Sequence, residues 1–420
     1  MVAVSILTLG ALFTQAWAMP AATGSAIVSA ATPAAATPTA ATPTAASTSL
    51  PVAESQLDNL AGLAYNASVE SVSSDSDIEK RGGCSLSNLR IRRDWRAFSS
   101  PQKKAYIKSI LCLQELPSLT PSDRAPGARS RYDDFVATHI NQTMTIHYTG
   151  TFLGWHRYFI WNFEEAMRNE CGYTGDFPYW NWGADAGSLE NSQVFDGSDT
   201  SMSGNGAHID AVGDIELSLG SYPVIHLPTG NGGGCVTSGP FTNYSVNLGP
   251  VSLMLPGGET GSTANPFAYN PRCLKRDLST KIIQDYANFT SIVDLILRYD
   301  NVYDFQMNMQ GVPGSGSIGV HGGGHYSMGG DPSRDVFVSP GDPAFWLHHG
   351  MIDRTWWIWQ NLNLRKRLNA ISGTGTFLNG PASPNTTLDT LINIGYAGGE
   401  TVAMRDIMST VSGPFCYIYL

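Results

Sequence analysis

Apolar residues recur three or four positions apart in several stretches of this chain, which is the spacing of one face of an α-helix. The clearest stretch is 152–167, where large apolar side chains repeat along one face. Similar spacing covers 101–111 and 278–298, and a last helix begins near Pro343. Residues 183–270 are instead rich in Gly, Ser, Asn and Pro, which predicts loops. The pattern therefore predicts a mainly α fold: a central helical bundle with long loops and a few short strands.

The first apolar run, residues 1–18, ends in the small-residue pattern Ala-Trp-Ala. This pattern is typical of a secretory signal peptide. The run is too short for a transmembrane anchor, and no later stretch approaches the length and apolarity of a membrane span. We therefore expect an exported, extracellular protein that does not use the membrane as a partner.

Residues 19–81 have a different composition from the rest of the chain. A tract of Ala, Thr, Pro and Ser comes first, and an acidic patch then closes on the pair Lys80-Arg81. Such a tract buries too little apolar surface to offset the entropy of ordering it, so we predict a disordered propeptide. The pair could be an ordinary solvated charge pair. Because the composition becomes aromatic directly after it, we predict removal of 19–81 and a folded domain at 82–420.

All six cysteines follow that pair, and none is in a CxxC motif. An even number in an exported chain predicts disulfides, with 15 pairings open. A Cys84–Cys416 bond would join the two ends of the folded domain, which is a hypothesis. Within residues 82–420, four sequons fit a glycoprotein, at Asn141, Asn243, Asn288 and Asn385. We expect Asn141 to be buried and unmodified because it lies between two histidines.

The formal net charge is −10 and the pI is about 5.3. A chain without a basic face lacks the charge that binds phosphates, so nucleic acid is excluded as a partner. The acidity is a solubility property of the molecule.

Histidines are concentrated in two short stretches, which hold seven of the nine in the chain. A single histidine in an aromatic helix usually packs in the core without a ligand. Here three lie within eighteen residues in the first stretch, and two in the second are spaced i and i+4, which places both rings on one helix face. This concentration indicates two metal sites of three imidazoles each. The seven are His139, His147, His156, His321, His325, His348 and His349.

Three glycines separate His321 from His325. Each lowers helix stability by about 1 kcal/mol relative to alanine. A plain glycine-rich loop is the alternative, but it does not explain the flanking histidines. The glycines therefore suggest that another backbone or a substrate approaches closely here.

The donor set favours copper among the possible metals. Six imidazoles without a carboxylate bridge or a thiolate suit copper, zinc, iron or nickel, and the HExxH helix of zinc proteases is absent. Neutral nitrogen ligands serve both Cu(I) and Cu(II), and two copper ions together match the two-electron reduction of dioxygen. The residues alone leave zinc open.

Two long motifs give the chain a family resemblance. The run His147-x4-Phe152-Leu-x-Trp155-His156-Arg157-x6-Glu164 resembles the copper A signature of the tyrosinase family. The run Asp342-Pro343-x-Phe345-Trp346-x-x-His349-x3-Asp353 resembles its copper B signature. The resemblance covers the whole region after residue 82, and the chain is most similar to short secreted fungal catechol oxidases and tyrosinases.

The resemblance implies two copper ions as cofactors and assigns their ligands. Copper A would be held by His139, His147 and His156, and copper B by His321, His325 and His349. It makes His348 a neighbour of the site and lets Asp353 orient His349. Exchange of the two adjacent histidines stays open.

Departures from the family pattern bear on the activity. Thr145 stands where many fungal members have a cysteine linked to a copper A histidine. Gly322 stands where efficient monophenol hydroxylases often have asparagine, and residues 305–320 contain no acidic residue to hold a water there. Val336 matches the position that controls access above copper A. These features favour o-diphenol oxidation over monophenol hydroxylation.

The resemblance thus predicts an enzyme that converts small phenolic substrates, the o-diphenols, into o-quinones with dioxygen as co-substrate. A true tyrosinase and an o-aminophenol oxidase are the alternatives within the family. A haemocyanin-like oxygen carrier and a dinuclear zinc hydrolase are alternatives of other classes.

Overall fold

The computed structural model describes residues 50–74, 83–210 and 212–420. The predicted signal peptide and the pair Lys80-Arg81 lie outside these residues. The described chain is mainly helical, and its strands form one three-stranded sheet and several two-stranded ones. The predicted fold class is confirmed.

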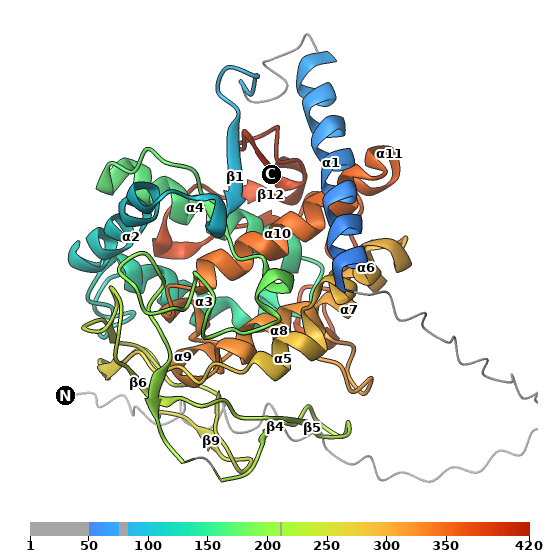
Figure 1. Cartoon of the computed structure of the whole chain (residues 1–420). Coiled ribbons are helices and arrows are strands. Elements are labelled where there is room, and N and C mark those ends of the chain that lie inside the picture. Colours follow the sequence, from blue (N-terminus) through green and yellow to red (C-terminus); the bar gives the residue numbers. More distant parts are fainter. Residues whose placement is uncertain (1–49, 75–82, 211) are drawn as a thin grey trace, which may run out of the picture.

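Four helices form the centre of the molecule: α3 (Arg131–Ile146), α4 (Phe152–Cys171), α8 (Gly319–Met328) and α10 (Phe345–Asn361). α10 runs across the middle and packs on α4 and α8 (Figure 1). α2 (Ser100–Glu115) covers α3 and α4. A helix that is apolar on all sides belongs in the interior, and α10 buries Trp346, Trp356, Trp357 and Trp359.

The apolar face of α4 explains its place in the bundle. The helix begins at Phe152, as the spacing predicts, and ends where Gly172 takes the left-handed conformation with φ 67°. Phe163 stacks on Trp346 of α10, with ring centroids 3.5 Å apart. Aromatic stacking therefore fixes α4 against α10.

The stretch 278–298 forms two helices, α5 (Thr280–Tyr286) and α6 (Phe289–Arg298), where the spacing suggested one. Ala287 between them has a non-helical backbone, and the Asn288 side chain accepts a hydrogen bond from the Ser291 N–H. That capping bond starts a new helix, which a purely apolar pattern does not reveal. Three further α-helices lie in the later part of the described chain: α7 (Val302–Gln310), α9 (Gly330–Ser333) and, after α10, α11 (Leu364–Arg367).

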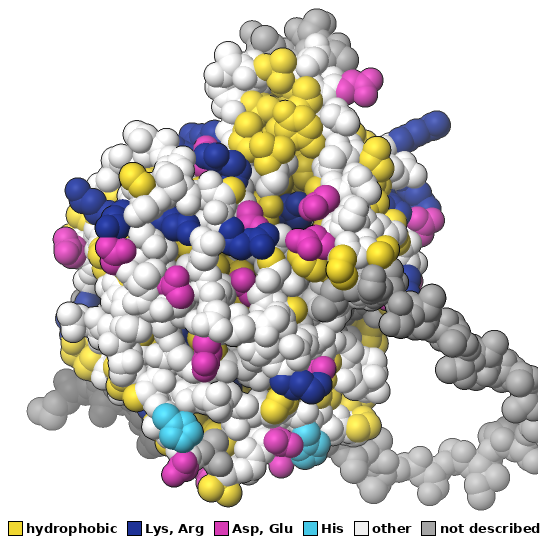
Figure 2. All heavy atoms as spheres, in the orientation of Figure 1, with side chains coloured by type: hydrophobic (Ala, Val, Ile, Leu, Met, Phe, Trp, Pro, Cys, Tyr) yellow, Lys and Arg dark blue, Asp and Glu magenta, His cyan; other side chains and the backbone are white. Residues whose placement is uncertain are grey.

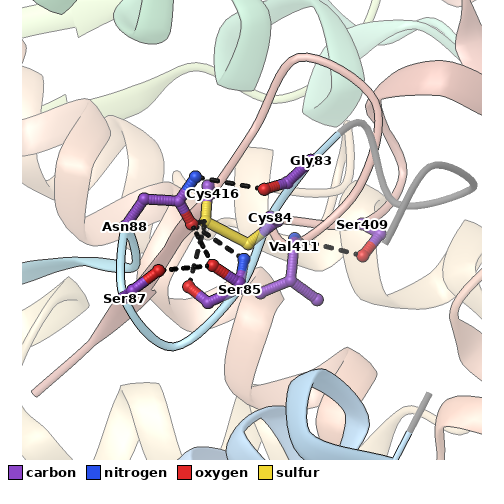
Figure 3. Close-up of a disulfide and its surroundings, with 8 residues drawn as sticks. All are labelled: Gly83, Cys84, Ser85, Ser87, Asn88, Ser409, Val411 and Cys416. Atoms are coloured by element: carbon purple, nitrogen blue, oxygen red, sulfur yellow. Dashed lines mark hydrogen bonds between the residues drawn. A yellow bond between two sulfur atoms is a disulfide. The ribbon is translucent and has the colours of Figure 1, made fainter. Parts of the chain in front are cut away.

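A small parallel sheet brings distant parts of the chain together. Its order is β13-β1-β2, with β1 (Arg90–Asp94) between β13 (Tyr417–Tyr419) and β2 (Pro178–Tyr179). A disulfide beside it joins Cys84 to Cys416, as hypothesised (Figure 3). Two further bonds complete the pairing, Cys112–Cys171 and Cys235–Cys273.

The loop-rich middle of the chain carries short strands, as predicted. The pairs are β3 (Gly206–His208) with β6 (Gly233–Val236), β4 (Ile215–Leu217) with β5 (Ile225–Leu227), β7 (Ser245–Val246) with β10 (Arg272–Cys273), and β8 (Leu253–Met254) with β9 (Thr260–Gly261). β11 (Leu391–Ile392) pairs with β12 (Val402–Ala403) near the end of the chain. In Figure 1 the β4–β5 and β8–β9 pairs lie at the lower edge, below α5 and α8.

Residues 50–74 correct the prediction of a disordered propeptide. They form helix α1 (Leu50–Ser74), which packs on α10 and α6. The prediction is wrong for this stretch because small residues such as Ala53 and Ala64 bury little area each, yet they let a helix lie close to its neighbour. The benefit depends on the partner surface, which the local composition does not contain.

Asn141 also differs from its prediction, since it is exposed. It lies two residues after His139 on α3, which places the two side chains about 200° apart around the helix axis. The histidine therefore points inward and the asparagine points to solvent.

Within the described ranges, no helix has the length and apolarity needed to cross a membrane. On the face shown in Figure 2, acidic side chains lie among the Lys and Arg side chains.

Candidate metal centre

The first group of histidines comes from the junction of α3 and α4. His139 lies on α3, His147 directly follows that helix, and His156 lies on α4. One ring nitrogen of each lies within 4.8 Å of the others, and all three side chains are buried. Helix ends and a helix face thus bring together three residues that are up to seventeen positions apart.

Hydrogen bonds fix which nitrogen of each ring is free. His139 Nδ1 lies 2.8 Å from the Phe337 carbonyl, His147 Nδ1 3.1 Å from that of Thr143, and His156 Nδ1 2.8 Å from that of Phe152. A carbonyl oxygen only accepts, so each Nδ1 carries the hydrogen. All three Nε2 atoms are buried without a partner. Three lone pairs therefore lie together in the interior, which is the arrangement of a metal site.

Tyr148 holds the turn that follows His147. Its backbone has φ 50°, its N–H donates to Gln310 Oε1 at 2.8 Å, and its hydroxyl donates to the Gln310 carbonyl at 2.8 Å. A left-handed backbone at a tyrosine is strained, so these bonds offset the strain and set the position of the neighbouring histidine.

The second group comes from α8 and α10. It contains His321 and His325 on one face of α8, with His348 and His349 on α10. His325 Nε2 lies 3.3 Å from His349 Nε2, while Nδ1 of both rings has no partner. His321 and His325 therefore lie on a helix, as their i, i+4 spacing predicts, and their rings lie close to the histidines of α10.

The two groups face each other across the bundle. The rings of His156 and His349 stack with centroids 4.6 Å apart, and those of His147 and His321 lie 5.8 Å apart. Two ions held by these groups would therefore be neighbours in one buried centre.

Burial keeps these imidazoles neutral. It lowers the pKa of all seven rings, of His147 to about 4, and the nearby imidazoles lower the pKa of six of them further. Neutral rings bind a metal without first losing a proton. The residues thus fit two copper ions, because the donors are nitrogen alone and lone pairs without partners point inward.

Comparison with known proteins agrees with this geometry. The sequence model described as the common central domain of tyrosinase matches residues 129–362. This chain belongs to the tyrosinase family.

Individual relatives cover nearly all of the described chain. It is 41% identical over 333 residues to Tyrosinase P of Aspergillus terreus, which covers 78% of this chain and 91% of that protein. It is 38% identical over 376 residues to the N-acetyl-6-hydroxytryptophan oxidase ivoB of Emericella nidulans, covering 86% and 99%.

Among solved structures, a mutant polyphenol oxidase from Thermothelomyces thermophila is 40% identical, with a TM-score of 0.81. The match covers 87% of this chain and 98% of that one. Since 87% is a larger share than residues 83–420 make up, the match reaches into α1.

The glycines between the two histidines of α8 leave space for neighbouring residues to pack directly against this helix. A Cβ on Gly324 would lie 2.2 Å from the His348 ring, and one on Gly323 would lie 3.0 Å from the Tyr286 Cβ. The close approach inferred from the glycines is confirmed. At Gly323 the neighbour is the end of α5, whose Tyr286 backbone carbon would lie 3.3 Å from the added Cβ, and at Gly324 the neighbour is the His348 side chain.

His348 has a different environment from His349. Its ring lies 5.3 Å from that of Trp182 and 4.4 Å from that of His325, and both of its nitrogens lack partners. The family resemblance implied that His348 is only a neighbour of the site, and the structure places it close enough to join the second group.

Asp353 does not contact His349, so its expected orienting role is wrong. Its carboxylate accepts hydrogen bonds from two arginines and two tyrosines, and His349 Nδ1 has no partner. The donors are Arg157, Arg92, Tyr417 and Tyr419. Burial alone would raise the pKa of Asp353, but the two arginines hold it below its ordinary value. The residue ties α10 to α4 and to the terminal strands.

An apolar pocket leads to both histidine groups. His147 and His321 lie on its wall, as do the two residues singled out from the family pattern, Gly322 and Val336. Its walls come from the β4–β5 hairpin, the loop after α7 and Phe377. Its lining includes one charged side chain, Arg334, which pairs with the buried Asp277.

Proposed function

We propose that this protein oxidises o-diphenols to o-quinones with dioxygen as acceptor, and hydroxylates monophenols weakly or not at all. The observation that carries the proposal is an apolar pocket that reaches His147 of one group and His321 and His325 of the other. A phenol ring that enters it meets both halves of the centre at once.

His139, His147 and His156 would hold one copper ion, and His321, His325 and His349 the other. When bound, the two ions would supply the redox chemistry that couples oxidation of the diphenol to reduction of dioxygen. The chain itself supplies position and surroundings. Backbone carbonyls orient three of the imidazoles, and the apolar wall excludes water from the ring of the substrate.

The pocket lining supports diphenol over monophenol chemistry. Hydroxylation of a monophenol needs a base that takes the phenolic proton. The residues that line the pocket include no Asp or Glu, and Gly322 offers no side chain that could hold a water. A diphenol, which needs no added oxygen, is the better substrate for such a site.

The proposed location is extracellular. Three disulfides join all six cysteines, and disulfides persist in oxidising compartments. The apolar residues 1–18 supply the proposed export signal.

The test is a comparison of initial rates of oxygen uptake on catechol, tyrosine and o-aminophenol, with metal analysis of the same sample. We expect two copper ions per chain and fastest turnover of catechol. Equal rates on tyrosine and catechol would contradict the diphenol proposal, and faster turnover of o-aminophenol would favour that substrate class. Zinc in place of copper, or reversible oxygen binding without quinone, would remove the oxidase proposal itself.

A further inference from the structure

We propose that α1 is a permanent part of the folded enzyme and stays bound to it after the chain is cut at Lys80-Arg81. The processed protein would then consist of two chains held together without a covalent bond. The proposal concerns the surface of α10 and α6 that α1 covers, which we call the groove, and it is independent of the substrate.

One face of α1 fills this groove. In Figure 1 the helix stands beside the end of α10 and above α6, and it contacts both, as well as β13. Its buried side chains repeat at helical spacing and are at most 4% exposed: Ala53, Leu57, Ala64, Ser68 and Val72. The opposite face is exposed, as at Leu63, which is 58% exposed. α1 is therefore an amphipathic helix, with one face packed against the rest of the protein and the other face in solvent.

Ser68 connects α1 to buried polar groups of α10. Its hydroxyl accepts a hydrogen bond from Trp357 Nε1 at 3.1 Å and donates one to Asn361 Oδ1 at 2.8 Å. Trp357 is 1% exposed. Without α1 its indole N–H would lose this partner, which is unfavourable for a group in an apolar setting.

The contact reaches the metal centre through a short chain of residues. The Trp357 ring lies 5.6 Å from that of Tyr419, and the Tyr419 hydroxyl donates to Asp353 at 2.6 Å. Asp353 lies one helical turn after His349 on α10. α1 therefore braces the helix that supplies the second histidine group.

Two further observations indicate that α1 stays bound after the cut. The solved polyphenol oxidase from Thermothelomyces thermophila matches this chain into α1, so that structure contains a counterpart of this segment. In addition, release of α1 would expose its buried Leu57 and Val72 side chains to water, which disfavours dissociation.

The experiment uses the full-length chain, cut at Lys80-Arg81 with a dibasic-specific protease. Should this pair resist the protease, a specific cleavage site in place of residues 76–81 gives the same cut. The products are separated by gel filtration with and without urea and identified by mass. We expect the α1 fragment to elute with the 82–420 body in buffer and to separate in urea. Separation in buffer, with either a monomeric or a dimeric body left behind, would overturn the proposal.

Matched variants test whether the groove is what retains the fragment. Leu57→Asp places a carboxylate in the groove, and Leu63→Asp makes the same change on the exposed face of the same helix. We expect Leu57→Asp to lower the retained fraction by about tenfold or more, and Leu63→Asp to leave it unchanged. Equal retention in both variants would contradict the proposal.

A milder pair serves if Leu57→Asp prevents folding. Ser68→Ala removes the partner of the Trp357 indole, while Ser73→Ala removes only an exposed bond to the Val69 carbonyl. The fragment should dissociate about threefold faster or more from Ser68→Ala, and at the wild-type rate from Ser73→Ala. Identical rates in the two variants would speak against the groove.

Discussion

Arg157 Nε lies 2.6 Å from Asp353 Oδ1, and both side chains are buried. Arg157 directly follows His156 on α4, and Asp353 lies one turn after His349 on α10. The two helices that carry stacked histidines from opposite groups are therefore joined by an ion pair at the same level of the bundle. The same carboxylate also accepts bonds from Tyr417 and Tyr419, so the end of the chain is tied to this point.

Replacement of Asp353 should destabilise the fold in a pH-dependent way. Asp353→Asn leaves buried arginines without their counter-charge, which costs about 3–5 kcal/mol at neutral pH. The folded-state pKa of Asp353 lies below its ordinary value of 3.8. Its stabilisation is thus fully present above that value and is lost as the pH falls through the folded pKa.

Urea unfolding from pH 7 to pH 3 measures this difference. The curves for wild type and Asp353→Asn should converge as the pH falls below about 4. Asp210→Asn, at a fully exposed side chain, should unfold like the wild type. A constant gap between Asp353→Asn and wild type at all pH values would contradict the account.

The adjacent histidines of α10 should differ in their effect on metal content. The His349 ring faces the other histidine group, while His348 packs against Trp182. We expect His349→Asn to contain one copper ion per chain and His348→Asn to contain two with lower affinity. Elemental analysis after dialysis measures both. The reverse result would exchange their assignments.

Gly324→Ala should disturb the second histidine group, although Gly324 itself has no side chain that could bind a metal. The added Cβ would lie 2.2 Å from the His348 ring, so the ring or α8 must move. Overpacking of this kind costs about 1–3 kcal/mol. Thermal unfolding and copper content report the effect. Gly187→Ala is the control, because no heavy atom lies within 4 Å of its new Cβ.

Gly322→Asn should raise the rate on monophenols relative to diphenols. The amide would add a polar group to the pocket wall next to His321, where it could hold a water that accepts the phenolic proton. Positioned proton transfer accelerates a reaction by about a hundredfold, so even partial success should raise the ratio about tenfold.

Gly322→Ala is the control for this change. Its Cβ would meet the same Ile318 Cβ at 2.8 Å, yet it adds no polar group. A similar rise in both variants would show that crowding, rather than the amide, sets the ratio of monophenol to diphenol rates.

A new charge on the pocket wall should change which diphenols are preferred. Leu219 lines the pocket on the β4–β5 hairpin, where no unpaired charge is present among the lining residues. Leu219→Arg should raise kcat/KM for a catechol carboxylate relative to an uncharged catechol about two- to fivefold, or about 0.4–1 kcal/mol. Leu391→Arg, at an exposed leucine outside the pocket lining, should leave the ratio unchanged. An unchanged ratio in Leu219→Arg would show that the hairpin does not contact the substrate.

Periodicity predicted the helices well where one face carries the signal. α4 begins at the predicted residue, and the i, i+4 histidines of α8 lie on a helix despite three glycines. The apolar spacing failed to predict the break between α5 and α6, because Asn288 caps α6 and starts a new helix there. It also failed for α1, whose small residues show their value only against the surface of α10 and α6.

Residue types at fixed spacing were enough to predict the fold class, the two histidine groups, the family and the Cys84–Cys416 hypothesis. What each of these residues contacts depended on tertiary packing. In the folded chain Asp353 binds Arg157 and not His349, His348 lies beside Gly324, and α1 packs on α10 and α6. Spacing fixes which face of a helix a residue occupies, whereas its partner comes from a distant segment. That partner is settled only when the segments pack together and exclude water.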